Sequence, residues 1–423
     1  MYQKALMIIL CMAMLTLAGC GNAPMEPTPT VDSVPMDDIG KAEGETPAPT
    51  AVPSTPTPTK EPDTIQRIVD GLTLDQKIGQ IMMVGFEGTT LNEHAKSMIN
   101  DYHVGGFIFF KRNMKSVSQT VSLVNALRVA NRPKPFPIFI SLDEEGGRVA
   151  RIPNAITQTP TARTIGKRKD EAYAKKIGEV IGLKCKKFGF NMDFAPVLDI
   201  NSNPDNPIIG DRAFGETIKT VSTSGIPVMQ GIQEQGVIPV VKHFPGHGDT
   251  SVDSHLGLPK VGNSLSRLKE FELVPFQSAI DKGADVVLVA HILFPEIDGD
   301  NPATFSQKIV TDILRDDMGF EGVICTDDME MGAITENYTM EDAAVRAFKA
   351  GNDLLLICHT EDKQIAAFNA INKAVQSGDI PMERLDESVY RILKLKKKYG
   401  LTDKPIDAVS TTKVNDAIAK ILG

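Results

Sequence analysis

Eight short apolar runs, separated by longer amphipathic stretches, constrain the fold of this 423-residue chain more than any other feature. Each run has the length and composition of a strand that is buried on both faces, as in a parallel sheet. Between the third and fourth runs, residues 173–188 place their apolar side chains on one helical face before Gly189. Eight such alternations predict an α/β fold, a (β/α)8 TIM barrel, with a doubly wound sheet as the alternative. The runs span residues 81–86, 106–110, 137–142, 190–195, 237–241, 285–290, 322–325 and 353–357.

Polar side chains stand at or near the ends of most of these runs. The carboxyl ends of TIM-barrel strands share one face of the barrel, and that face holds the active site. We therefore expect these side chains to gather in one place. They are Asp143 after the third run, Asp193 and Asp199 around the end of the fourth, Lys242 and His243 after the fifth, His291 after the sixth, Asp327 after the seventh and His359 after the eighth.

The segment 242–259 contains three histidines and two aspartates. Asp253 and His255 are two residues apart, so on an extended segment they face the same way, and the carboxylate can orient the imidazole and favour its protonated form. This spacing predicts that His255 donates a proton near neutral pH. A metal site on His243, His247 and His255, or a purely structural role, are the alternatives. The adjacent Lys242 disfavours a dication.

The seventh run ends in two adjacent aspartates, Asp327 and Asp328. A carboxylate at the end of a barrel strand suits a nucleophile, which must be held rigidly beneath an anomeric carbon. Successive side chains of a strand alternate between its two faces, so only one of the two aspartates should face the barrel axis. The chemistry of the residues leaves open which one it is.

Two further segments, 143–151 and 210–215, supply groups that suit a sugar. A carboxylate such as that of Asp143 can accept two sugar hydroxyls, and arginine or lysine side chains can donate to others. Taken singly, each segment could form no more than a salt bridge in a loop. On one face of a barrel, the two segments together indicate a sugar subsite.

Four segments, 143–151, 210–215, 242–255 and 325–329, resemble those of family 3 glycoside hydrolases, in the β-N-acetylglucosaminidase branch that acts on sugars from peptidoglycan. The similarity runs from Leu72 to about Gly400. It implies a TIM-barrel catalytic domain, retention of configuration and a covalent intermediate on Asp327, with His255 as acid/base assisted by Asp253. It also implies that the terminal sugar is bound by Asp143, Arg151, Arg212, Lys242 and His243. We expect no cofactor and no metal.

Two other functions remain as alternatives. One is a family 3 β-glucosidase or β-xylosidase, many of which take their acid/base from a second domain or an adjoining region. In this sequence we expect only a helix and a tail after the barrel, which favours the loop with Asp253 and His255 as the proton donor. The other alternative belongs to a different class, a tethered lipoprotein that binds sugar without turnover.

The N-terminal residues have the pattern of a lipoprotein signal peptide. Lys4 precedes an apolar run at 5–17, and the run closes on Leu-Ala-Gly-Cys at 17–20, like a lipobox whose Cys20 carries the lipid. Plain secretion is the alternative. We expect a Pro/Thr-rich linker at 21–62, a catalytic domain at 63–400 and a C-terminal tail at 401–423. The protein would then be exported and lipid-anchored to the outer face of the bacterial cell membrane.

Charge and cysteine content restrict the partners further. The net charge of −9 is not offset by a long basic run, so nucleic acid is an unfavourable partner. Cys185, Cys325 and Cys358 remain in the expected mature chain without a CxxC pair, which argues against disulfides and thiolate metal sites. We expect a monomer with a carbohydrate substrate and with membrane contact through the lipid alone.

Overall fold

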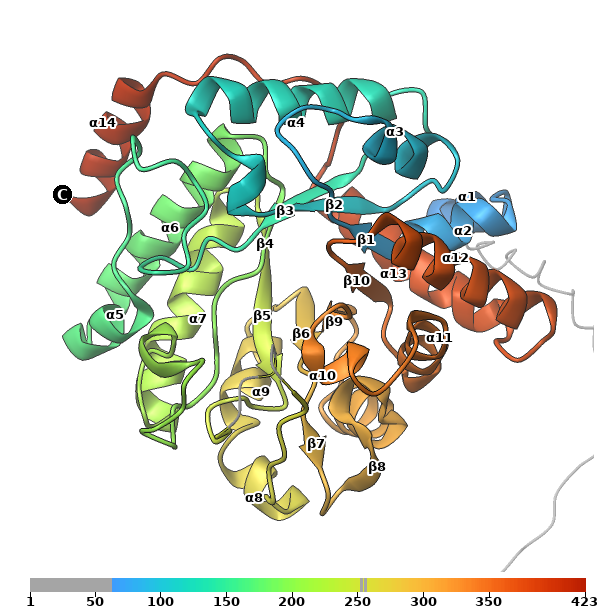
Figure 1. Cartoon of the computed structure of the whole chain (residues 1–423). Helices are drawn as coiled ribbons and strands as arrows, with labels where there is room; N and C mark the ends of the chain where they lie inside the picture. Colours follow the sequence, from blue (N-terminus) through green and yellow to red (C-terminus); the bar gives the residue numbers. More distant parts are fainter. Residues whose placement is uncertain (1–62, 252–253, 255–256) are drawn as a thin grey trace, which may run out of the picture. The chain divides into compact units, whose positions relative to one another are not determined.

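Eight parallel strands form a closed barrel in the computed structural model, which describes residues 63–251, 254 and 257–423 (Figure 1). Each apolar run of the sequence contributes one strand, so the predicted TIM barrel is confirmed. Around the barrel the strands follow the order β1-β10-β9-β6-β5-β4-β3-β2, and β1 closes the ring by pairing with both β10 and β2. Their bounds are Met82–Val84 (β1), Gly106–Phe109 (β2), Phe139–Leu142 (β3), Met192–Asp193 (β4), Ile238–Phe244 (β5), Val286–Val289 (β6), Val323–Asp328 (β9) and Leu354–Ile357 (β10).

Helices follow the strands and form the outer layer (Figure 1). The expected helix before Gly189 is α6, whose apolar side chains at Ile177, Val180 and Ile181 are buried. Gly189 follows it in a left-handed conformation, with φ of 83°. The helices are α1 (Thr64–Asp70), α2 (Leu74–Gln80), α3 (Glu93–Asn100), α4 (Val117–Asn131), α5 (Ala162–Arg168), α6 (Glu171–Lys187), α7 (Ile218–Glu234), α8 (Leu265–Glu270), α9 (Val274–Asp281), α10 (Gly332–Thr335), α11 (Met340–Ala350), α12 (Glu361–Gln376), α13 (Met382–Lys398) and α14 (Thr411–Leu422).

Aromatic rings fill part of the barrel core. Phe86 stands edge-on to Phe107 and Phe109, with ring centroids 5.6 and 5.5 Å apart, and Phe109 meets Phe190 in the same way at 5.2 Å. Edge-to-face contacts of this kind add to the stabilisation that burial of the rings supplies. The register of the strands, with Leu142 opposite Asp193, brings the polar residues that follow β3 and β4 to the same end of the barrel.

One insertion interrupts the regular alternation after β6. The short antiparallel strands β7 (Leu293–Phe294) and β8 (Asp298–Pro302) form a hairpin beside the barrel. A turn at Ala303–Phe305 and a ten-residue π-helical segment at Lys308–Asp317 then lead to β9. The π-helical segment replaces the α-helix that the alternation leads one to expect between these strands.

The C-terminal residues pack on the outside of the barrel. Helix α14 buries Val414 and Ile418 and lies beside α6 (Figure 1). Its Asn415 side chain accepts the N–H of Thr157 at 2.9 Å and donates to the carbonyl oxygen of Ala155 at 3.1 Å. The helix therefore supports the loop between β3 and α5.

Cys185, Cys325 and Cys358 are free thiols and are buried, so none of these three forms a disulfide. Within the described part of the chain, no helix combines the length and the apolar character that are needed to cross a bilayer.

Candidate active site

Lys242 and His243, neighbours near the end of β5, both face one pocket. Successive side chains of a regular strand point to opposite faces, but the pairing of β5 with β6 shifts register between Val241 and Phe244. Such irregularities re-aim side chains at the rim of a barrel, and both residues line the same cavity. This cavity has a volume of about 330 Å³ and lies at the carboxyl ends of the strands, where TIM-barrel enzymes hold their active sites.

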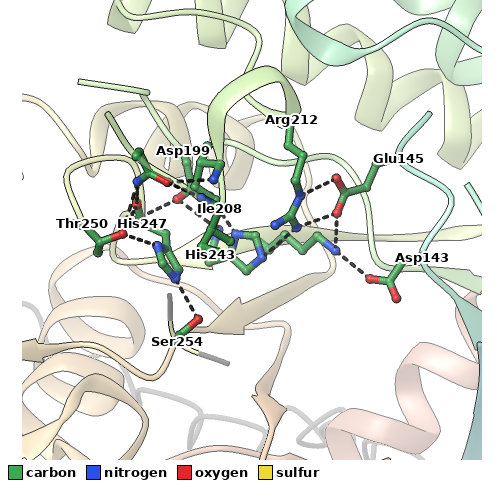
Figure 2. A network of polar contacts seen from close by, with 12 residues as sticks. Asp143, Glu145, Asp199, Ile208, Arg212, His243, His247, Thr250 and Ser254 are labelled. Atoms are coloured by element: carbon green, nitrogen blue, oxygen red, sulfur yellow. Dashed lines mark hydrogen bonds and ion pairs between the residues drawn. The ribbon is translucent and has the colours of Figure 1, made fainter. Parts of the chain in front are cut away.

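The ammonium group of Lys242 joins two carboxylates, that of the buried Glu145 and that of the partly buried Asp143 (Figure 2). Its Nζ lies 2.8 Å from Asp143 Oδ1 and 2.8 Å from Glu145 Oε1. Arg212 donates to both oxygens of the same Glu145 carboxylate, at 2.8 and 2.9 Å. Arg151 makes a looser contact, 3.5 Å from Asp143 Oδ2. Cations and carboxylates therefore alternate along the pocket wall, with the paired bonds that guanidinium and carboxylate groups favour.

These contacts keep the groups of the wall charged. Burial alone would raise the pKa of Asp143 and of Glu145, but the cations beside them bring both values below the ordinary range. Burial would likewise lower the pKa of Lys242, and its carboxylate partners raise it instead. The wall thus offers fixed acceptors and donors near neutral pH, as the recognition of sugar hydroxyls requires.

A second ion pair, beneath the pocket, fixes the loop that follows β3. Glu144 and Lys184 of α6 are fully buried, and their charged atoms lie 2.5 Å apart. The other Glu144 oxygen accepts the N–H groups of Arg151 and Ile152, at 2.7 and 3.0 Å. The N–H of Glu144 donates to Asp193 Oδ1 at 2.8 Å, and burial raises the pKa of Asp193 well above its ordinary value. The backbone that carries Arg151 is therefore held from below.

The His243 side chain is held between Asp199 and Arg212 (Figure 2). Its Nδ1 lies 2.7 Å from Asp199 Oδ2, and its Nε2 lies 3.3 Å from Arg212 Nη2. A guanidinium group can only donate, so Nε2 accepts and Nδ1 carries the proton that is donated to Asp199. The other Asp199 oxygen accepts the N–H of His247 at 2.7 Å. One buried carboxylate therefore orients His243 and fixes the loop that continues from it.

His247 is a second buried histidine beside the pocket. Its ring stands edge-on to that of His243, with centroids 5.7 Å apart. Its Nδ1 lies 2.8 Å from Thr250 Oγ1, and its Nε2 lies 3.1 Å from Ser254 Oγ (Figure 2). Burial lowers the pKa of His247 to about 4, with a further contribution from the neighbouring His243. The His247 ring is therefore neutral near pH 7.

The structure separates the two aspartates at the end of β9. Asp327 lines the pocket and accepts the N–H of Asp328 at 2.8 Å. Asp328 instead accepts the N–H groups of Glu330 and Cys358, at 3.0 and 3.1 Å, and its other oxygen lies 2.9 Å from His359 Nε2. Asp327 is thus the carboxylate that a bound ligand can reach, and Asp328 holds the neighbouring loops together.

Asp327 is held in its ionised form. Burial alone would raise the pKa of its carboxyl group, but the imidazoles of His243 and His291, the N–H of Asp328 and the ammonium of Lys242 bring it below the ordinary value. An ionised carboxylate at this position can act as a nucleophile.

Six residues that the sequence assigns to substrate binding or catalysis line this one pocket. They are Asp143, Arg151, Arg212, Lys242, His243 and Asp327. Asp253, His255 and Cys20 lie outside the described residues, so their assignments stay predictions.

His291, whose role the sequence left open between packing and substrate contact, is fully buried. Its ring nitrogens lie 2.7 Å from Thr304 Oγ1 and 3.0 Å from the carbonyl oxygen of Asp328. These contacts favour a role in holding the Asp327–Asp328 turn.

The sequence did not indicate Glu145 and Ser254, nor the contact of Asp199 with His243. Glu145 stands two residues after Asp143, and the same spacing had been used to pair Asp253 with His255, so alternation along an extended segment could have found it. Asp199 was noted only for its place after the fourth run. No pattern distinguishes Ser254 from other loop serines.

A metal centre on His243 and His247 does not fit their surroundings. The guanidinium of Arg212 lies against Nε2 of His243, and both ring nitrogens of His247 are hydrogen-bonded to hydroxyl groups. In residues 63–251, 254 and 257–423, no three or more His, Cys, Asp or Glu side chains are grouped so that they could hold a metal ion. The third proposed ligand, His255, lies outside these residues.

A closed parallel barrel whose strand ends present an ionised aspartate beside fixed donors and acceptors defines a TIM-barrel enzyme with a polar, hydroxyl-rich substrate. The family model described as the glycosyl hydrolase family 3 N-terminal domain matches residues 73–395. The chain therefore belongs to glycosyl hydrolase family 3, and it is a glycoside hydrolase.

Several similar proteins carry the name β-hexosaminidase or β-N-acetylglucosaminidase. β-Hexosaminidase LpqI of Mycobacterium tuberculosis is 32% identical over 404 residues, which cover 93% of this chain and 97% of the relative. β-Hexosaminidase A of Pseudoalteromonas piscicida is 33% identical over 381 residues, and the match covers 81% of this chain but only 64% of that longer protein. The structure of a family 3 β-N-acetylglucosaminidase from Paenibacillus sp. FPU-7 superimposes with a TM-score of 0.78 at 40% identity, covering 83% of this chain and 68% of that one. The chain groups with the β-hexosaminidases, as its four motifs indicate.

Proposed function

We propose that this chain is a retaining, exo-acting β-N-acetylglucosaminidase that removes terminal, non-reducing β-linked GlcNAc. The observation that carries the proposal is the pocket, in which the ionised Asp327 shares one cavity with the donors and acceptors of Lys242, Arg212 and Asp143. Its volume of about 330 Å³ is at the small end for ligand sites, which suits a single sugar at the end of a chain. The β-hexosaminidase relatives support GlcNAc as that sugar.

In the first step of this mechanism, Asp327 attacks the anomeric carbon of the bound sugar. A glycosyl–aspartate ester forms, the bond to the leaving oxygen breaks, and that oxygen takes a proton from the acid/base residue. Water then attacks the anomeric carbon from the side opposite to the ester bond. It gives a proton back to the acid/base residue, and the carboxylate of Asp327 is released. Two inversions at one carbon give net retention of configuration.

His255, assisted by Asp253, is the acid/base residue of this proposal. The two-residue spacing of the pair and the resemblance to family 3 support this assignment, and Ser254, the residue between them, is buried and lines the pocket. A histidine then replaces the second carboxylic acid of the usual retaining scheme.

We further propose that the natural substrates are GlcNAc-containing cell-wall fragments and that the protein is anchored through a lipid on Cys20. The lipobox-like residues 17–20 and the Pro/Thr-rich segment 21–62 support this location. Labelling of growing cells with a radioactive fatty acid should mark the protein, and Cys20→Ala should abolish the label. Equal labelling of both proteins would contradict the anchor.

Hydrolysis of 4-nitrophenyl β-GlcNAc, compared with the corresponding glucoside, tests the activity. We expect Asp327→Ala to lower kcat by about 10⁴-fold or more, because the covalent intermediate can no longer form. Added azide should take the place of the missing carboxylate and yield the α-glycosyl azide, which identifies the nucleophile.

Asp312→Ala is the matched control, because this carboxylate is exposed and does not line the pocket. It should retain wild-type kcat. Substantial activity of Asp327→Ala without azide would contradict the assignment of the nucleophile, and faster cleavage of the glucoside would contradict the choice of substrate.

A further inference from the structure

Ser254, which stands between Asp253 and His255 in the sequence, is held at two points. Its side chain is 2% exposed, and its Oγ lies 3.1 Å from His247 Nε2 (Figure 2). Its carbonyl oxygen accepts the N–H of Ala333, in α10 just after β9, at 3.1 Å. Ser254 therefore connects the loop after β5, the strand that carries Lys242, to the segment after β9, the strand that carries Asp327.

The direction of the His247–Ser254 hydrogen bond follows from the surroundings of His247. The Thr250 hydroxyl lies 3.1 Å from the carbonyl oxygen of His247 and donates its only hydrogen there. Thr250 Oγ1 must then accept from Nδ1 of the ring, at 2.8 Å. In the neutral ring, Nε2 is left as an acceptor, so the Ser254 hydroxyl donates to it.

The acceptor for Ser254 is itself rigidly held. The N–H of His247 donates to Asp199 at 2.7 Å, and Asn206 Nδ2 donates to the His247 carbonyl oxygen at 2.8 Å. His247 is also 2% exposed, and its burial keeps the ring neutral through the ordinary range of working pH. The backbone of His247 is thus held by Asp199 and Asn206, and its ring is held on the Nδ1 side by Thr250, so Ser254 binds an acceptor with a fixed position.

We propose that the His247–Ser254 hydrogen bond is a positioning contact for the proton donor: it fixes the chain between Asp253 and His255 to the barrel and so determines where His255 can deliver its proton. This inference deepens the proposed function and rests on it. Neither His247 nor Ser254 exchanges a proton with the substrate in this scheme. Both act through the residue that follows Ser254, so their loss should affect proton donation selectively.

Two substrates whose leaving groups differ in their need for a proton separate this role from general damage to the site. The dinitrophenolate of 2,4-dinitrophenyl β-GlcNAc leaves without protonation, whereas the alcohol of N,N′-diacetylchitobiose must be protonated as it leaves. Positioned general acids contribute about 10² to 10⁴-fold. We expect Ser254→Ala to lower kcat/KM for chitobiose by roughly 10- to 100-fold and for the dinitrophenyl glycoside by less than about three-fold.

Ser251→Ala is the matched control, because Ser251 belongs to the same loop and is exposed. It should leave both values of kcat/KM unchanged. Equal losses on the two substrates in Ser254→Ala, or no loss on either, would overturn the positioning role.

His255→Ala, measured in parallel, separates failure of this inference from failure of the proposed function. If His255→Ala loses chitobiose cleavage selectively and Ser254→Ala does not, the inference is wrong and the acid/base assignment stands. If His255→Ala shows no selectivity, the acid/base assignment is wrong and the inference falls with it.

A double-mutant cycle tests the hydrogen bond itself. His247→Phe keeps a ring of similar size and removes the acceptor. If both residues act through one bond, the double variant should cleave chitobiose about as slowly as the more impaired single variant. Multiplication of the two separate losses would show that the residues act independently and would overturn the proposal.

Discussion

Glu145 is a single carboxylate on which the sugar pocket depends more than its place in the sequence suggests. Its carboxylate accepts hydrogen bonds from Nε and Nη2 of Arg212 and pairs with the ammonium group of Lys242, and its side chain is almost completely buried. The buried Lys242 and the largely buried Arg212 share this anion, so its removal would leave both cations poorly compensated. The charge of Glu145, rather than its size, sets the positions of Lys242 and Arg212.

We predict that Glu145→Gln lowers kcat/KM for 4-nitrophenyl β-GlcNAc by about 100-fold, mainly through a higher KM. An amide cannot neutralise two cations, and breaking a buried pair in this way costs about 3–5 kcal/mol. Part of this cost lowers the free energy of unfolding, and the rest weakens substrate binding. Steady-state kinetics and urea unfolding measure the two parts.

Glu234→Gln is the control for this change. Glu234 also pairs with a lysine, at 2.7 Å from Lys175 Nζ, but both side chains are about half exposed. Exposed pairs contribute about 0–1 kcal/mol, so kinetics and stability should remain near wild type. A Glu145→Gln variant that behaved in the same way would contradict the role given to the buried carboxylate.

Sequence alone could assign most pocket residues because they stand directly at strand ends. Asp143, Lys242 and Asp327 were found in this way, and the barrel topology then implies that they meet. Alternation says that one of Asp327 and Asp328 faces the axis without saying which; the resemblance to family 3 pointed to Asp327, and Asp327 is the one that lines the pocket. The contact between His243 and Asp199 depends on the path of the loop after β4. The periodicity of apolar residues predicts helices and strands, but it does not predict the path of a loop.

At the scale of elements, the strands could be predicted because burial on both faces leaves a continuous apolar run. The hairpin of β7 and β8 could not, because β8 has the sequence Asp-Gly-Asp-Asn-Pro and lies at the side of the barrel. The π-helical segment after it has ordinary amphipathic composition, and the bonding pattern of its backbone is decided by packing. The β7–β8 hairpin and the π-helical segment could not be predicted, because tertiary contacts rather than sequence periodicity define them.

At the scale of the whole molecule, the buried Lys396 of α13 couples folding to protonation. This side chain is 3% exposed; its Nζ donates to Gln80 Oε1 at 2.8 Å and to the carbonyl oxygen of Gly105 at 3.1 Å, and it lies 4.6 Å from the ring centroid of Phe139. Burial lowers its pKa to about 7, and the partly opposing charge of Asp403 does not restore it. Folding therefore changes the protonation of this lysine.

The sign of the resulting pH dependence follows from that change. An unfolded lysine has a pKa of about 10.4, so between about pH 7 and pH 10 the unfolded chain holds a proton that the folded chain has released. The contribution of Lys396 to the free energy of unfolding therefore rises with pH in this window, by up to about 1.4 kcal/mol per pH unit. Below about pH 7 the folded protein bears the full cost of the buried charge.

We predict that Lys396→Met removes this dependence. The free energy of unfolding of the wild type minus that of the variant should increase by roughly 1 kcal/mol per pH unit between about pH 7.5 and 9.5, as measured by urea unfolding. Lys397→Met changes an exposed neighbour on the same helix and should give a difference that is flat with pH. Parallel curves for the wild type and Lys396→Met would contradict the prediction.

The three buried cysteines, Cys185, Cys325 and Cys358, can report local opening of the barrel through their rates of alkylation. Cys185 lies in α6, Cys325 in β9 and Cys358 directly after β10, and burial raises the pKa of each thiol well above its ordinary value. Only a thiolate reacts readily with an alkylating reagent, so the native barrel protects all three. The rate at which each cysteine is alkylated then reports the opening of its own part of the barrel.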